Sequence, residues 1–369
     1  MGHLVNAKEE VYRALAERLN RYPVGAPVNE TLLSILHRLY TETEAMVGSK
    51  LPLQPLPLDK IVDITGMGRS ELQKLLEDMS YRGLILDLPR KDGVYYMLAP
   101  MVVGFFEYTF MRVREDINMR ELAELFEIYF KDEKVREELA GKETKLMRTL
   151  VYEQLIPAAV ESEVLTYERA SEIIRQSGDG AISLCSCRHK ASHLGKACDA
   201  PLEVCMSLGN AARWVVAKGM ARPATVDEML RVLDQTTQLG LVHICDNVLN
   251  QPAYMCHCCG CCCTILRSIK EFGKHATHPS NFIPALDAES CSGCGSCAAA
   301  CQIDAINMLE CNGNEQPAVN REMCIGCGVC AAACPTGALT MSRRETIYTP
   351  PASQKEKFMR MAMEKGRLG

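Results

Sequence analysis

The sequence predicts a multidomain α+β protein, and three observations lead to that fold class. All 20 cysteines lie between Cys185 and Cys334, so a cysteine-free first half precedes a cysteine-rich second half. Apolar residues of the first half recur at helical spacing, and a duplicated cysteine motif near the end favours short helices alternating with strands. We expect a helical domain over 1–110, a helical and cysteine-rich domain over 111–280, a duplicated domain over 281–345 and a tail over 346–369.

Amphipathic helices define the first half. Apolar residues fall at i, i+3, i+4 and i+7 in three segments, which are Leu32, Ile35, Leu36 and Leu39; Leu72, Leu75, Leu76 and Met79; and Leu122, Leu125, Phe126 and Tyr129. Between the first two segments, Pro52, Pro55 and Pro57 forbid a regular helix, so residues 51–58 are predicted to form a linker.

Residues 58–98 are predicted to form a short helix, a turn at Gly66, a second helix and two strands over 84–88 and 94–98. This order resembles a winged helix. A DNA-binding winged helix needs basic residues to neutralise phosphates, but residues 59–92 contain six Lys or Arg against seven Asp or Glu. The charge therefore favours a protein-docking or dimerising role over nucleic acid binding.

The cysteines indicate metal or cluster ligation rather than disulfides. The amino terminus lacks the pattern of a secretory leader, and apolar stretches such as 101–106 are too short to span a bilayer. We therefore expect a cytoplasmic protein without a membrane span, in a compartment that keeps thiols reduced. The net charge of −5 gives no reason to expect general attraction to nucleic acid or anionic membranes.

The strongest motif is a repeat of 33 residues. Four cysteines, Cys291, Cys294, Cys297 and Cys301, recur as Cys324, Cys327, Cys330 and Cys334. The spacing C-x2-C-x2-C-x3-C lets one tight loop aim three thiolates at three corners of a cubane cluster, and glycines such as Gly295 and Gly328 allow the backbone to approach it. Each half is predicted to be a cysteine loop, a short helix and a strand.

The duplicated motif resembles bacterial two-cluster ferredoxins over its whole length. The resemblance implies two [4Fe–4S] clusters, with the fourth cysteine of each half placed at the entry of the following helix and ligating the cluster of the other half. One cluster is expected on Cys291, Cys294, Cys297 and Cys334, and the other on Cys324, Cys327, Cys330 and Cys301. In this family a proline follows the fourth cysteine of each half. The second half has this proline at Pro335, whereas the first half has Gln302 in its place. A pair of all-thiolate zinc sites is the alternative.

A second cysteine field precedes this motif. It consists of ten candidate ligands, which are Cys185, Cys187, Cys198, Cys205, Cys256, Cys258, Cys259, Cys261, Cys262 and Cys263. Alternation along an extended loop would send Cys256, Cys258 and Cys262 to one side and Cys259, Cys261 and Cys263 to the other. We expect the early and late groups to interleave and to hold one or two further [4Fe–4S] clusters, with one structural zinc ion or no metal as alternatives. Cys311 is expected to be a plain thiol in a turn between the repeats.

Cys258-Cys259-Gly260 is similar to part of the cysteine-rich signature of heterodisulfide-reductase-type proteins, which implies a catalytic cluster. The further widely spaced cysteines of that signature are not found here. His257 is a candidate metal ligand, but we expect it to be solvated or to hydrogen-bond sulfur. Arg188, His189 and Lys190 are expected either near a cluster, where their charge would raise its potential, or on a solvated face.

Together these features favour an iron–sulfur electron-transfer component of an anaerobic or microaerobic metabolism, working between redox partner proteins. One rival is a reductase whose middle domain binds substrate at a cluster. Another is a redox-sensing regulator that binds DNA. The basic stretch 355–367 is expected to form a packed or solvated terminal helix rather than a partner-docking one.

Overall fold

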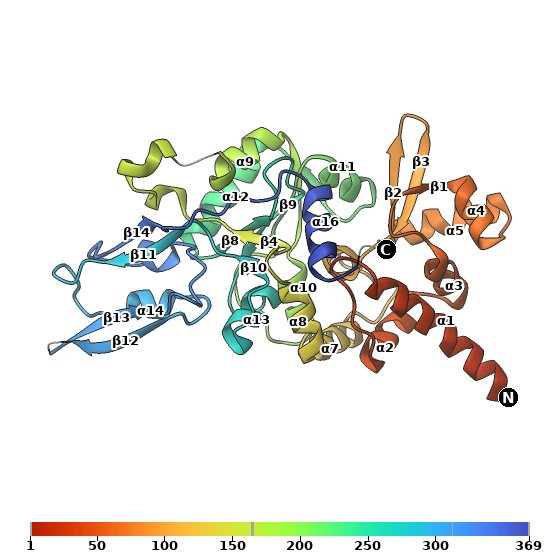
Figure 1. Cartoon of the computed structure of the whole chain (residues 1–369), viewed down its shortest axis with the longest axis horizontal. Helices are drawn as coiled ribbons and strands as arrows, with labels where there is room; N and C mark the ends of the chain where they lie inside the picture. The colour runs from red at the N-terminus through yellow and green to blue at the C-terminus, as the bar shows by residue number, and fades with distance from the viewer. Residues whose placement is uncertain (1, 164–165, 312, 368–369) are drawn as a thin grey trace.

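The computed structural model describes residues 2–163, 166–311 and 313–367 of the chain. Figure 1 shows an elongated arrangement in which N-terminal helices occupy one end and the duplicated cysteine segment the other. A seven-stranded sheet lies between them. The protein is thus a mixed helix and sheet structure with a cysteine-rich centre.

Amphipathic helices build the N-terminal end, as the spacing predicts. The first three are α1 (Gly2–Asn20), α2 (Glu30–Leu39) and α3 (Glu42–Lys50). Helix α2 begins after Asn29, whose side chain accepts a hydrogen bond of 2.9 Å from the backbone N–H of Leu32. Its buried face is the predicted stripe of Leu32, Ile35, Leu36 and Leu39, together with Leu33.

The predicted order of elements over residues 58–98 is confirmed. Helices α4 (Leu58–Thr65) and α5 (Arg69–Tyr81) precede the hairpin of β2 (Ile85–Arg90) and β3 (Gly93–Leu98). Gly66 takes a φ of 74° where α4 ends, a conformation that favours glycine. The short strand β1 (Leu56–Pro57) pairs with β3. The likeness to a winged helix stays a prediction.

Further helices cover the centre of the molecule. They are α6 (Phe106–Phe110), α7 (Met119–Tyr129), α8 (Glu133–Ala140), α9 (Ala170–Ser177), α10 (Ser186–His193), α11 (Gly209–Ala217), α12 (Val226–Gln238) and α13 (Thr264–Phe272). The predicted helix through Leu122 is α7, capped by Asn118.

The central sheet has the strand order β10-β4-β8-β9-β6-β5-β7. Its strands are β4 (Met147–Thr149), β5 (Gly180–Leu184), β6 (Glu203–Ser207), β7 (Arg222–Ala224), β8 (Val242–Asp246), β9 (Tyr254–Cys258) and β10 (Thr277–His278). β10 and β4 run parallel, and the other neighbours are antiparallel. Pairing of β6 with β9 brings the two parts of the second cysteine field to adjacent strands.

The duplicated segment folds as two similar halves. Its elements are β11 (Phe282–Leu286), α14 (Ser296–Ala300), β12 (Ile306–Cys311), β13 (Asn314–Val319), α15 (Val329–Ala332) and β14 (Leu339–Arg343). Two expectations are corrected here. Cys301 and Cys334 follow the short helices instead of opening the next ones, because each helix already begins after the loop glycine. Cys311 is an exposed residue of β12 paired with Asn314, not a turn residue.

The tail forms α16 (Gln354–Glu364), which packs against the centre of the molecule. Lys357 is 1% exposed and makes an ion pair with the fully buried Asp246 at the end of β8. The prediction of a packed terminal helix is therefore confirmed. None of the helices in the described residues combines the length and the hydropathy needed to cross a bilayer.

Candidate metal centres

Four cysteines from both halves of the duplicated segment line one pocket. They are Cys291, Cys294, Cys297 and Cys334, together with the loop residue Gly295 and the strand residue Met308. Cys294 is exposed and Cys297 is buried, so the pocket opens to solvent on the Cys294 side. These four cysteines are the set that the ferredoxin resemblance assigned to one cluster, with its fourth member taken from the other half. We call them the outer set.

The complementary cysteines gather separately from the outer set, and we call them the inner set. Cys301 lies near enough to Cys324, Cys327 and Cys330 for its charge to raise the pKa of each of these thiols. Burial is the main cause in every case and raises the pKa of Cys327 to about 12. Because such thiols are neutral on their own, a bound metal must displace their protons.

Backbone N–H groups point at the fourth cysteine of each half. The N–H of Ala305 donates to Cys301 Sγ at 3.2 Å. Burial acts to raise the pKa of Cys334, but hydrogen bonds outweigh it and lower that pKa; Leu339 and Ala338 are among the backbone donors. Ala305 and Ala338 are equivalent in the 33-residue repeat. The repeat therefore preserves an N–H···S contact of the kind that stabilises a cluster's negative charge.

The ten cysteines of the second field separate into two groups. The larger one, the six-thiol group, is a chain of neighbouring thiols, each of which shifts the pKa of the next, in the order Cys185, Cys205, Cys256, Cys258, Cys263 and Cys187. Its members come from the start of α10, strands β6 and β9, and the start of α13. All six are buried or half-buried.

Two helix N-termini point into the six-thiol group. Cys185 is the N-cap of α10 and Cys263 the N-cap of α13. Hydrogen bonds from Cys187 and Cys258 outweigh burial and lower the pKa of Cys263, and the backbone N–H groups of Leu266 and Ile265 lower it further. Positive helix ends stabilise thiolates and anionic clusters, so this site is suited to negative charge.

The smaller group, the four-thiol group, consists of Cys198, Cys259, Cys261 and Cys262. Their sulfur atoms all lie within 4.8 Å of one another. Cys198 comes from the loop after α10, and the other three from the loop that joins β9 to α13. Hydrogen bonding to Cys262 and the charge of Arg188 outweigh burial and lower the pKa of Cys259 to about 4.

The expected alternation along 256–263 holds as far as Cys261 and fails at Cys262 and Cys263. Cys256 and Cys258 share one group, and Cys259 and Cys261 share the other, but Cys262 and Cys263 are exchanged. The physical reason is that β9 ends at Cys258 and the chain then turns before α13, so the period of two is lost.

Polar neighbours of the second field are buried rather than solvated. Arg188 is fully buried, and its Nη2 donates to Cys259 Sγ at 3.4 Å. Lys190 is also buried and pairs with Glu127 at 2.7 Å. The expectations for His257 are wrong, since this residue is fully buried, contacts Thr236 Oγ1 at 3.1 Å and stacks edge-on against His243.

The duplicated segment touches the second cysteine field through Gln302. Its Oε1 accepts a hydrogen bond of 2.7 Å from the N–H of Gly260, and its Nε2 donates to the carbonyl of Gly240 at 3.0 Å. A second contact joins the backbone N–H of Tyr152 to the carbonyl of Cys327 at 3.1 Å. The sequence marks Gln302 by its departure from the family's proline, but it carries no signal for Tyr152.

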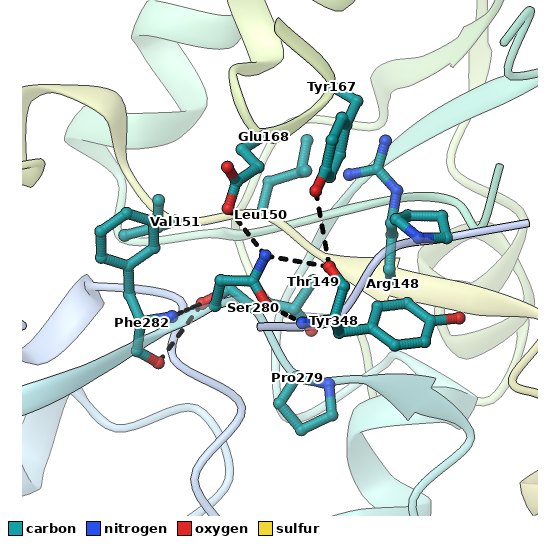
Figure 2. Close-up of a pocket in the computed structure, with 12 residues that line it drawn as sticks. Arg148, Thr149, Leu150, Val151, Tyr167, Glu168, Pro279, Ser280, Phe282 and Tyr348 are labelled. Atoms are coloured by element: carbon teal, nitrogen blue, oxygen red, sulfur yellow. Dashed lines mark hydrogen bonds between the residues drawn. The ribbon is translucent and has the colours of Figure 1, made fainter. Parts of the chain in front are cut away.

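A separate pocket lies where the central sheet, β11 and the tail meet (Figure 2). Asn281 forms its centre, because its amide donates to Glu168 at 2.8 Å and to the carbonyl of Tyr348 at 3.1 Å. The N–H of Tyr348 in turn donates to Asn281 Oδ1 at 2.8 Å. These contacts, drawn as dashed lines in Figure 2, link Glu168, Asn281 and the tail residue Tyr348 and hold the duplicated segment against the sheet.

Comparison with known proteins identifies the duplicated segment. Residues 290–338 match the family model described as a 4Fe-4S dicluster domain. Neither the curated proteins nor the solved structures contain a match to this chain. The chain therefore carries a C-terminal 4Fe-4S dicluster domain in residues 290–338, which includes all eight cysteines of the 33-residue repeat.

Proposed function

We propose that this protein relays low-potential electrons between redox partner proteins, starting from the dicluster domain at residues 290–338. The observation that carries the proposal is the pocket in which Cys334 joins Cys291, Cys294 and Cys297. Four thiolates converging from both halves fit one cubane, and the inner set fits a second. Such clusters supply one-electron transfer without breaking a substrate bond.

The different exposure of the outer and inner sets supports an order in which electrons pass through them. The outer set contains the exposed Cys294 and faces solvent, where a partner protein can approach. The inner set is more buried, adjoins the second cysteine field through Gln302 and contacts the central sheet region through Tyr152. We propose that electrons pass between a partner at the outer set and the middle domain behind the inner set.

We further propose that the six-thiol group holds one more [4Fe–4S] cluster. Its thiols converge from four elements, and two helix N-termini offset the negative charge that a thiolate-bound cluster carries. Burial of these cysteines favours electron transfer over substrate binding. The reductase rival would need an open path from solvent to this group.

Iron and acid-labile sulfide per chain, measured on the full chain purified without oxygen, test the proposal. Three clusters give about twelve iron and twelve sulfide, and reduction should bleach the visible absorption reversibly. Cys256→Ser should remove about four of each and leave the dicluster signals in the EPR spectrum, whereas Cys311→Ser should change neither. Colourless protein with negligible sulfide would refute the whole proposal. If Cys256→Ser keeps all of its iron, the six-thiol group holds no third cluster.

A further inference from the structure

The four-thiol group has different dimensions from the other cysteine sites. Three of its sulfur contacts are 3.6 Å for Cys198 to Cys259, 3.6 Å for Cys261 to Cys262 and 4.0 Å for Cys262 to Cys198. Four sulfurs around one zinc ion, each at 2.3 Å in a tetrahedron, are about 3.8 Å apart. The observed contacts scatter around that edge length.

The dicluster domain provides an internal standard for comparison. In a cubane each thiolate binds a different iron, so the four sulfurs stay further apart than when they share one ion. Over residues 2–163, 166–311 and 313–367, the four-thiol group is the only set of three or more Cys, His, Asp or Glu residues whose ligand atoms lie within 4.8 Å of one another. Neither the outer set nor the inner set meets that spacing, and the six-thiol group does not meet it either.

From this difference we propose that Cys198, Cys259, Cys261 and Cys262 bind a single zinc ion, separate from the iron–sulfur clusters. Four thiolates close the tetrahedron and leave no open position, which is the arrangement of structural zinc sites. Zinc is favoured over ferrous iron because soft thiolates in a tetrahedral arrangement select zinc, and ferrous iron stands near the weak end of the divalent affinity series, which peaks at copper. The thiols that still carry protons release them when the ion binds.

Charge around the group supports this assignment. A divalent ion with four thiolates carries a net charge of −2, which burial penalises unless cations are near. The fully buried Arg188 donates to Cys259 Sγ, and its other amino group donates to the carbonyl of Pro201 at 2.6 Å.

The position of the site indicates a structural role for the ion. Cys198 and Cys259 are 61 residues apart, so a shared ion closes a long loop between α10 and the end of β9. Gly260 lies between two of the ligands, and its N–H donates a hydrogen bond to Gln302 Oε1. Zinc would therefore fix the loop on which the inner set of the dicluster domain rests.

The test is elemental analysis of the full chain, purified without oxygen from cells grown with zinc and iron. We expect one zinc per chain in the wild type. Cys261→Ser should lose most of that zinc while its iron and acid-labile sulfide stay at wild-type values. Cys311→Ser, which removes another exposed cysteine, should keep zinc, iron and sulfide unchanged. The proposal is wrong if Cys261→Ser loses about four iron and four sulfide, which would make the group part of a cluster.

Zinc-edge X-ray absorption of the wild-type protein gives an answer even if the variant does not fold. Four sulfur neighbours at about 2.3 Å are expected. A shell of nitrogen and oxygen, absence of zinc, or one extra iron without sulfide would each overturn the assignment. These results are independent of the proposed relay, which fails only if the iron and sulfide of the clusters are missing or redox-inactive.

Discussion

Gln302 Oε1 accepts a hydrogen bond of 2.7 Å from the backbone N–H of Gly260, and this contact joins the dicluster domain to the second cysteine field. Gln302 directly follows Cys301 of the inner set, and Gly260 lies between Cys259 and Cys261 of the four-thiol group. The inner set and the four-thiol group are therefore connected by a path of a few bonds through one amide side chain.

Replacing Gln302 by alanine should loosen this junction. Two hydrogen bonds are lost, and each contributes about 1 kcal/mol. We expect amide hydrogen exchange of the segment 256–263 to become roughly fivefold faster per kcal/mol lost, with no change in iron content. Gln316→Ala, at a more exposed amide with a 3.4 Å contact to Ala288, is the matched control and should leave that exchange unchanged. Equal exchange in wild type and Gln302→Ala would show that the amide does not hold the loop.

Gly260→Ala should be destabilising for a steric reason. A Cβ atom at Gly260 would lie 1.9 Å from the carbonyl oxygen of Gln302, so one of the two backbones must move. Overpacking of this kind costs about 1–3 kcal/mol, which should appear as a lower denaturation midpoint under anaerobic conditions. The control is Gly68→Ala, where the added Cβ meets no atom within 4 Å. A midpoint equal to that of the control would contradict the close approach.

Lys357→Met should be costly because it leaves the buried Asp246 without its cation. Removing one member of a buried ion pair lowers the free energy of unfolding by about 3–5 kcal/mol. Lys355→Met removes the same charge from an exposed position of the same helix and should stay within about 0.5 kcal/mol of wild type. Denaturant unfolding of the three proteins side by side tests this, and similar midpoints for both variants would disprove the role of the pair.

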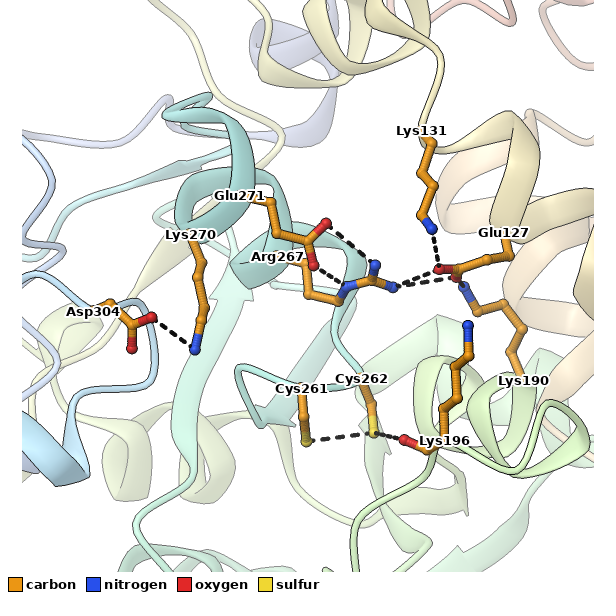
Figure 3. Close-up of polar contacts among 10 residues, drawn as sticks. All are labelled: Glu127, Lys131, Lys190, Lys196, Cys261, Cys262, Arg267, Lys270, Glu271 and Asp304. Atoms are coloured by element: carbon orange, nitrogen blue, oxygen red, sulfur yellow. Dashed lines mark hydrogen bonds and ion pairs between the residues drawn. The ribbon is translucent and has the colours of Figure 1, made fainter.

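Glu127 should make stability depend on pH. Burial acts to raise the pKa of its carboxyl, but Lys190 and Arg267 outweigh that effect and lower the pKa from 4.5 to about 2 (Figure 3). Its folded-state pKa lies below the unfolded value, so its contribution is complete above pH 4.5 and is lost as the pH falls towards 2.

We therefore expect Glu127→Gln to cost about 3 kcal/mol at pH 7, because Lys190 stays buried without its partner. The difference in the free energy of unfolding between wild type and variant should narrow below pH 4.5. Both proteins share the same general acid lability, so it cancels in this difference. Glu124→Gln, on the same helix in an exposed pair with Arg120, should show almost no effect at any pH. A gap that stays constant from pH 7 to pH 3 would rule out this explanation.

The local part of the metal chemistry can be predicted from sequence, and the long-range part cannot. The spacing of Cys291, Cys294 and Cys297 fixes one loop, so its ligands can be identified without a fold, and the matching family model covers them. The division of the second field depends on pairing of β6 with β9 and on where α10 and α13 begin. Those contacts join residues far apart in the chain, so no spacing rule reveals them.

The burial of polar residues could not be predicted from the sequence either. Arg188 and His257 carry no signal that separates a buried position from a solvated one, because a polar side chain is buried only where tertiary partners satisfy it. By contrast, the helices through Leu36, Leu76 and Phe126 follow from apolar periodicity alone.

The ion pair between Asp246 and Lys357 also has a consequence for how the protein is made. During synthesis the strand that carries Asp246 leaves the ribosome 111 residues before its cation does. A carboxylate buried without its cation is costly, so we expect β8 to settle into its final place between β4 and β9 only once the tail has emerged. Completion of the cysteine-bearing sheet would then be a late step of folding.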